Sequence, residues 1–193
     1  MAKFIIEHMD SELFEWSIIE YEHISEAVGK GNLIFANIKN DKNKKILKKY
    51  GNVFGKNTSD LKLKNICILD ANAEKTLEAS DKNKFDYFVF GGILGDNPPQ
   101  KRTGQLINSF KNKNISSESR NLGKEQMPTD TAVITANKIL HGERMEDMKF
   151  SDGIEIEISE NESVLLPYRY LLINGNPDCS KKLAEYLKKK QEF

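Results

Sequence analysis

The sequence predicts an α/β protein in which a mostly parallel β-sheet carries helices on both faces. Two short runs, "NICILD" (65–70) and "FDYFVF" (85–90), are too apolar for strands that expose one face to water. Segments with helical periodicity and capping residues alternate with such runs, the order typical of a parallel sheet. With 193 residues, of which 38% are hydrophobic, the chain is long enough for one sizeable domain.

The individual helices and strands are predicted from the periodicity of apolar residues, from helix-capping residues and from glycines that end helices. A helix after the first strand is expected to begin at a cap provided by Asp10 or Ser11 and to end at Val28, because Gly29 is a stop signal. A later helix, 129–142, has Thr129 or Asp130 as its predicted cap. The remaining expectations are strands at 3–8, 32–38, 65–70, 85–90 and 114–120, helices at 41–51, 101–110 and 180–191, an acidic strand or hairpin at 153–159 and an apolar run at 164–173.

Charge is balanced overall but unevenly distributed. The formal net charge is zero, which argues against a strongly basic nucleic-acid-binding protein. Residues 1–30 contain seven acidic residues and two lysines, and residues 152–162 contain five acidic residues and no basic one. Residues 39–64 contain nine lysines and two aspartates. Each patch alone is typical of a solvated surface, whereas two acidic patches together favour a cationic substrate.

Targeting signals and cysteine chemistry indicate a cytoplasmic protein. No run approaches the roughly 18–20 apolar residues of a membrane helix, and the apolar stretch near the N-terminus is only "FII", so no membrane association is expected. Cys67 and Cys179 have neither a disulfide pattern nor metal-ligand spacing, so both are expected to be reduced thiols.

Three loops rich in small residues follow three successive predicted strands. They are "DANAE" (70–74), "GGILGD" (91–96) and "RNLGKEQMPTDT" (120–131). Because ligands of open parallel sheets bind beyond the carboxyl ends of the strands, these loops together predict a site for a flat organic ligand. The chain has no GxxxxGK[ST] and no HExxH, "GGILGD" is not GxGxxG, and the three histidines are scattered, so neither a P-loop nor a metal site is predicted.

These residues resemble the cofactor-binding half of the SPOUT methyltransferases. A strand ending in "GGILGD" and a helix opened by "LGKEQMPTDTA" carry the likeness, and "IIEHM", "EW", "PP", "RT" and "PYRY" extend it over most of residues 3–173. The resemblance is to the eukaryotic and archaeal branch that includes a fungal protein arginine methyltransferase acting on a small-subunit ribosomal protein. It implies a trefoil knot in the C-terminal half, a single domain over 1–193 with residues 150–193 as a family-specific extension, and a monomer.

The resemblance also assigns roles to the loops. It implies that S-adenosylmethionine is the cofactor and that three walls surround it. The implied cofactor-binding residues are Asp70, Ala71, Asn72 and Ala73 in the first wall, Phe90, Gly91, Gly92, Gly95 and Asp96 in the second, and Leu122, Gly123, Gln126, Met127, Thr129 and Thr131 in the third.

An arginine acceptor arrives as a cation, so carboxylates are expected to orient it and to help it lose a proton. The candidate catalytic residues are Asp96, beside the cofactor loop, and Glu7, at the end of the first strand. For Glu7, a structural salt bridge is an equal alternative. Four residues are candidates for substrate binding: His8, Glu15, Trp16 and Glu20, the last three on roughly one helix face, although Trp16 is also consistent with a core position.

Two other functions stay open at this point. RNA methylation would need a basic groove, which only the lysines of 39–64 and 181–190 can supply. A SPOUT domain without catalysis, serving as a ribosome- or RNA-binding module, is the other alternative. The intact glycine loop and the "TDTA" segment favour an enzyme.

Overall fold

The computed structural model describes residues 2–92, 103–160 and 162–190. At its centre is a six-stranded sheet with the order β3-β2-β1-β5-β4-β6, in which all neighbouring strands are parallel. The strands are β1 (Lys3–His8), β2 (Leu33–Ala36), β3 (Asn52–Val53), β4 (Ile66–Leu69), β5 (Tyr87–Gly92) and β6 (Ser117–Arg120). The predicted parallel sheet is therefore confirmed, while the trefoil knot stays a prediction.

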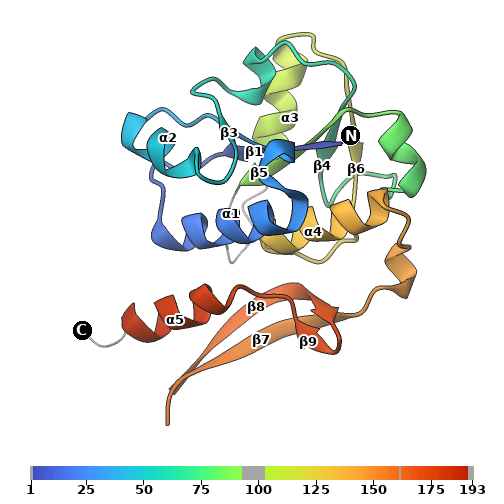
Figure 1. Ribbon diagram of the computed structural model, residues 1–193. Helices are drawn as coiled ribbons and strands as arrows, with labels where there is room; N and C mark the ends of the chain where they lie inside the picture. The colour runs from blue at the N-terminus through green and yellow to red at the C-terminus, as the bar shows by residue number, and fades with distance from the viewer. Residues whose placement is uncertain (1, 93–102, 161, 191–193) are drawn as a thin grey trace.

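Helices cover both faces of this sheet, as the apolar strands require. The helices are α1 (Glu15–Val28), α2 (Asp41–Leu47), α3 (Thr103–Asn112) and α4 (Thr129–Leu140). In β1 the side chains alternate: Ile5 packs with Leu106 and Phe110 of α3, whereas Phe4 and Ile6 belong to the core that α1 and α4 cover. Figure 1 shows the sheet between α3 on one side and α1 with α4 on the other.

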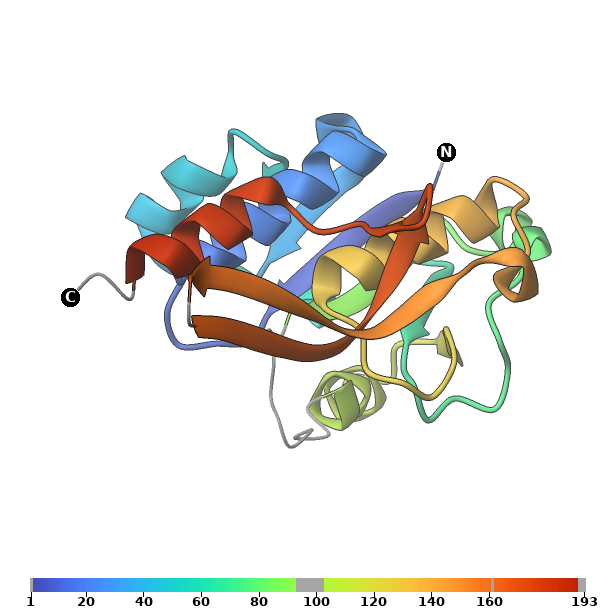
Figure 2. The ribbon, with the colours of Figure 1, turned by 90° about the horizontal axis from the view of Figure 1, so that it is seen from below.

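A fourth layer lies under α1 and α4. Strands β7 (Phe150–Ser159), β8 (Glu162–Ile173) and β9 (Asn176–Pro177) form an antiparallel sheet, and helix α5 (Lys181–Lys190) follows it. Helix α5 packs against α1, and β8 against α4. The view from below shows this C-terminal unit, residues 150–190, crossing both helices (Figure 2). The described residues also form four 3₁₀ helices: η1 (Lys30–Asn32), η2 (Thr58–Asp60), η3 (Ala79–Asn83) and η4 (Met145–Asp147).

One predicted helix start is wrong, and so are the predicted cap residues of a second helix. Helix α1 begins at Glu15, not beside Asp10 or Ser11, because Phe14 at its N-cap is extended while the preceding Leu13 packs against the core. Helix α4 begins at Thr129 after Pro128, so the predicted cap residues lie inside the helix and no side chain of the N-cap residue serves as a cap. The helices α2 and α4 also end earlier than predicted, at Leu47 and Leu140, and the short strand β3 was not predicted.

Two further expectations concern thiols and membranes. Cys67 is buried in β4 and Cys179 is half-buried, and neither forms a disulfide. Burial raises the pKa of each thiol to about 12, which makes both poor nucleophiles at neutral pH. Among the described helices, none has the length and apolar character needed to cross a membrane.

A histidine joins the three elements that meet beneath the sheet. His23 of α1 lies with Nδ1 2.9 Å from Asp130 Oδ2 at the start of α4 and with Nε2 3.4 Å from Asp178 Oδ1, just before α5. Burial alone lowers the pKa of His23, but the hydrogen bonds and charges of the two aspartates outweigh it and raise this pKa to about 10. The imidazolium therefore links α1 to α4 and to the C-terminal unit at neutral pH.

We expect His23→Gln to lower the free energy of unfolding at pH 7 by about 2 kcal/mol, because charge-assisted hydrogen bonds are lost. The folded-state pKa of His23 is raised, so its stabilisation is complete below pH about 6.5 and disappears as the pH rises through about 10. Urea unfolding from pH 6 to 10.5 should therefore show the difference between wild type and variant narrowing at the alkaline end. The control is His141→Gln, at the exposed end of α4. A constant difference across this range would contradict the assignment.

Candidate functional site

A cleft of about 160 Å³ lies beyond the carboxyl ends of β4, β5 and β6. Strand β4 pairs with β5 on one side and β6 on the other, so the three loops that follow these strands meet there, as predicted. The walls are Leu69, Asp70 and Ala71 after β4, Phe90 and Gly91 at the end of β5, Leu122, Gly123, Glu125, Gln126, Met127, Thr129 and Ala132 after β6, and Thr103 at the start of α3.

Nine of the predicted cofactor-binding residues line this cleft, and the lining does not include four further described ones, Asn72, Ala73, Gly92 and Thr131. Asn72 and Ala73 stabilise the turn of the first loop. The backbone N–H of Asn72 donates to Asp70 Oδ1 (3.1 Å), and that of Ala73 donates to Asp70 O (3.0 Å). Thr131 is buried within α4, and Gly92 pairs with His8 at the strand end. Gly95 and Asp96 lie outside the described residues. Four lining residues were not predicted, namely Leu69, Thr103, Glu125 and Ala132.

The sequence also missed Asn121, which ties two walls of the cleft together. Its Nδ2 donates to Ala73 O in the first loop (2.8 Å), and its Oδ1 accepts from the backbone N–H of Gly123 in the third loop (3.0 Å). Its own backbone pairs with Lys75 O and with the N–H of Leu77 (2.8 and 3.0 Å). An asparagine after a strand is common in turns, so no sequence signal distinguished it.

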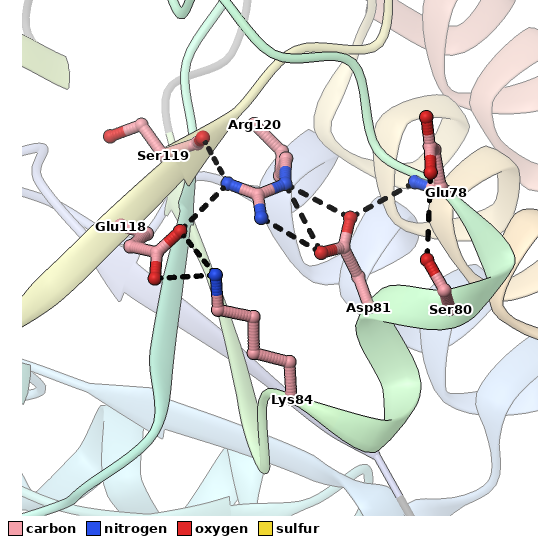
Figure 3. Close-up of polar contacts among 7 residues, drawn as sticks. All are labelled: Glu78, Ser80, Asp81, Lys84, Glu118, Ser119 and Arg120. Carbon is pink, nitrogen blue, oxygen red and sulfur yellow. Dashed lines mark hydrogen bonds and ion pairs between the residues drawn. The ribbon is translucent and has the colours of Figure 1, made fainter.

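A buried ion pair anchors the strand that leads into this turn. The guanidinium of Arg120 donates to both carboxylate oxygens of Asp81 at 2.9–3.2 Å, and both residues are buried. Glu118 bridges Arg120 and Lys84 on the outer side, so charges of both signs alternate across the network (Figure 3). The hydrogen bonds to Asp81 raise the pKa of Arg120. The carbonyl of Arg120 then accepts from the N–H of Asp70 (2.9 Å), which fixes the first loop.

The two predicted functional residues at the end of β1 point to opposite faces of the sheet. Glu7 Oε2 accepts from the backbone N–H and the hydroxyl of Thr58, at 2.7 and 2.5 Å, so its contact is structural but is made with a neutral threonine and not with the cation of the predicted salt bridge. Burial raises the pKa of Glu7, although the Thr58 hydrogen bonds oppose it. His8, on the α1 side, has Nδ1 3.0 Å from the Tyr21 hydroxyl, while its buried Nε2 has no hydrogen-bond partner among the described residues. Burial lowers the pKa of His8, so its ring is neutral at pH 7.

The predicted substrate residues of α1 are split between the interior and the surface. Glu20 is buried against the N-terminus of α4, where the N–H groups of Thr129 and Asp130 face its carboxylate. Its Oε2 has no hydrogen-bond partner among the described residues, and burial raises its pKa well above the usual range. Glu15 and Trp16 are exposed instead, with Lys190 of α5 over the Trp16 ring at 5.9 Å. The prediction that Glu20 shares one exposed face of the helix with Glu15 and Trp16 is therefore wrong. The alternative that Trp16 lies in the core is also wrong.

Charged surfaces and metal ligands complete the description. The acidic side chains of the β7–β8 hairpin, including Glu155, Glu157 and Glu162, are exposed. Within the described ranges, no three His, Cys, Asp or Glu side chains are placed to hold a metal ion.

Comparisons with known proteins identify close relatives over almost the whole chain. Residues 3–193 match the family described as "Protein arginine N-methyltransferase SFM1-like". The chain is 39% identical to "Protein arginine N-methyltransferase SFM1" of Saccharomyces cerevisiae, covering 97% of this chain and 94% of the relative. It is also similar to crystal structures of the yeast arginine methyltransferase SFM1 complexed with SAM and with SAH. The SAM complex has a TM-score of 0.88 at 38% identity, with 100% of this chain and 92% of that chain covered; the SAH complex has 0.85 at 37%, with 96% and 94% covered.

A more distant likeness concerns the fold alone. The dual-specific Trm10 of Thermococcus kodakaraensis matches with a TM-score of 0.59 at 17% identity, covering 75% of this chain and 96% of that one. This neighbour is a SPOUT protein, so the SPOUT fold expected from the resemblance is supported independently of the close relatives.

We expect Asn121→Asp to loosen the junction between the first and third loops. The aspartate keeps an acceptor for Gly123 but faces the carbonyl of Ala73 without a proton to donate, at a cost of about 1–3 kcal/mol. Hydrogen exchange of amides 73–77 and 121–127 should accelerate roughly tenfold or more, while exchange in β1 stays unchanged. The control is Asn114→Asp, in an exposed turn after α3. Unchanged exchange in both loops of Asn121→Asp would show that the junction does not depend on this side chain.

Proposed function

Since this chain belongs to the SFM1-like protein arginine N-methyltransferase family, we propose that it methylates an arginine side chain of a small-subunit ribosomal protein with S-adenosylmethionine as the donor. The observation that carries the proposal is the cleft at the ends of β4, β5 and β6, which nine of the predicted cofactor residues line. Leu69, Phe90, Leu122, Met127 and Ala132 offer apolar walls for an adenine ring, and loop backbone offers hydrogen bonds.

The reaction breaks the sulfonium–methyl bond and forms a bond from the methyl carbon to a guanidinium nitrogen, which then loses a proton. When bound, S-adenosylmethionine supplies an electrophilic methyl group and an excellent leaving group. The protein therefore has to align the acceptor and receive its proton. Both tasks call for polar groups without other partners beside the cleft.

Among the described residues, His8 and Glu20 are buried ionisable groups that each adjoin a wall residue and have one polar atom without a hydrogen-bond partner. His8 ends β1 in register with Gly92, next to Gly91 of the cleft wall, and in the neutral tautomer whose Nδ1–H donates to the Tyr21 hydroxyl, Nε2 is able to accept a proton. Glu20 lies against Thr129, another wall residue, and its unpartnered Oε2 is suited to hold the guanidinium. We propose these as the acceptor-side groups, and the predicted catalytic role of Asp96 is retained with them. Glu7 is proposed to support the end of β1 through Thr58.

The surface supports a cationic protein as substrate. The exposed acids of the β7–β8 hairpin and Glu15 at the start of α1 offer electrostatic attraction to a basic protein. We also propose that the enzyme is a monomer, since the C-terminal unit covers α1 and α4. A cytoplasmic location is proposed because Cys67 and Cys179 are free thiols.

A labelling experiment tests the acceptor class. Purified protein, methyl-labelled S-adenosylmethionine and isolated small ribosomal subunits should give label that protease removes and ribonuclease does not, on a methylated arginine identified by mass spectrometry. Label that ribonuclease releases would instead establish RNA methylation, the alternative that the exposed lysines of α2 favour. Absence of both label and cofactor binding would leave the non-catalytic module.

We expect Glu20→Gln to lower kcat on the order of 100-fold, since a carboxylate facing a cation is lost at the transition state. Because burial raises the pKa of Glu20, the wild-type rate should rise with pH through a value above that of an ordinary glutamate, and Glu20→Gln should lack this rise. The affinity for S-adenosylmethionine should change little in either protein. Glu26→Gln, exposed on the same helix, is the control. A wild-type pH profile in Glu20→Gln would refute the assignment.

A further inference from the structure

The segment "PYRY" (167–170) carries part of the family likeness but has no role in the function proposed so far. It lies in β8 of the C-terminal unit, which the layer of α1 and α4 separates from the sheet that carries the cleft. Arg169, its third residue, reaches the third loop of the cleft from this layer. The side chain is 26% exposed, so most of it is enclosed by neighbours.

Arg169 contacts two successive residues of that loop. Its backbone N–H donates to Gln126 O (2.9 Å), and its Nη1 donates to Glu125 Oε2 (2.7 Å). Glu125 and Gln126 both line the cleft. The hydrogen bonds of backbone N–H groups and the charge of Arg169 lower the pKa of Glu125, so the ion pair is present at neutral pH.

The guanidinium is held in place from the side of the C-terminal unit. It lies over the ring of Phe150 in β7, 4.4 Å from the centroid, and its Nε is 4.0 Å from Asp152 Oδ1. A stacked, planar guanidinium loses little freedom when it binds a carboxylate, so its contact with Glu125 has a defined direction.

The contact between Arg169 and Glu125 lies beside the turn at Gly123 in the third loop. Gly123 has a φ of +96°, a conformation that favours glycine, and a Cβ at this position would lie 3.2 Å from Glu125 Oε2 and 3.5 Å from Arg169 Nη1. The ion pair therefore packs directly against the turn, so a Cβ at position 123 would touch Arg169 and press against the Glu125 carboxylate.

We propose that Arg169 is a positioning residue for the cofactor site: through Glu125 and Gln126 it holds the third loop in its binding conformation. The C-terminal unit then contributes a residue that positions the cofactor-binding loop, in addition to packing against α1 and α4. This inference rests on the proposed function, because the cofactor that the loop would bind is S-adenosylmethionine.

A charge exchange across the pair tests the proposal. Calorimetric titration with S-adenosylhomocysteine should show affinity reduced roughly tenfold in Arg169→Glu and in Glu125→Arg, and largely recovered in the double variant. Arg169→Lys, which keeps the charge but not the planar fork, should fall between wild type and Arg169→Glu. In the protein without ligand, hydrogen exchange of amides 122–127 should follow the same order. Arg144→Glu is the control, because Arg144, just before η4, is 71% exposed and this substitution makes the same charge change.

Each outcome separates this inference from the proposed function. If wild-type protein does not bind S-adenosylhomocysteine, the proposed function is wrong. If wild type binds and Arg169→Glu binds equally well, or if the double variant is no better than either single variant, the positioning role is wrong. Should Arg169→Glu fail to fold by circular dichroism, Arg169→Lys and Arg169→Gln decide, and wild-type affinity and exchange in both would refute the role.

Discussion

The site depends on the hydrogen bonds that pair β4 with β5 on one side and with β6 on the other. Because the three strands are parallel neighbours, the loops after them leave the sheet at one edge within reach of each other. Strand β4 is buried along its whole length and pairs on both sides, so it sets the spacing of the two outer walls. The Arg120–Asp81 pair and Asn121 then fix the backbone just beyond the sheet, where ladder hydrogen bonds no longer hold it.

Polar groups at this end of the molecule fall into two kinds. Glu7, His23 and Asp130 have partners that account for their burial, and their roles in holding elements together follow from those partners. His8 Nε2 and Glu20 Oε2 are buried without a hydrogen-bond partner among the described residues. A buried polar atom that lacks a partner costs free energy, so such atoms are expected chiefly where a ligand or a reaction supplies the missing contact. This lack of a hydrogen-bond partner is shared by the hydroxyls of Ser17, Thr131, Thr135 and Ser151 and by the Nε of Arg169. His8 and Glu20 differ from them because their side chains can exchange a proton, and the two properties together identify the proposed acceptor-side groups.

The sequence supported the sheet and the cleft better than the details around them. Apolar strands such as "ICIL" and the small-residue loops after them identify the parallel sheet and its ligand edge, because both follow from burial and chain direction. The start of α1 was missed because Leu13 packs against the core and keeps Phe14 extended, a tertiary effect that no cap residue signals. Glu20 and Trp16 were placed on one face because the spacing of residues along a helix predicts the direction of each side chain around its axis. It does not predict which other element packs against that side chain. Asn121 and Arg169 act through contacts with residues 44–48 positions away, beyond any local pattern.

The position of β1 has a consequence for the order in which the chain can fold. Residues 3–8 form the interior of the sheet, yet one of their two partners is β5, residues 87–92. During synthesis this first strand therefore leaves the ribosome long before β5 does, and until then the backbone edge that β5 will occupy is unpaired and can bind another chain. Closing so long a loop is entropically costly, so completion of the sheet centre is a late and slow event. The N-terminal third is thus the part of a nascent chain that most needs protection from aggregation.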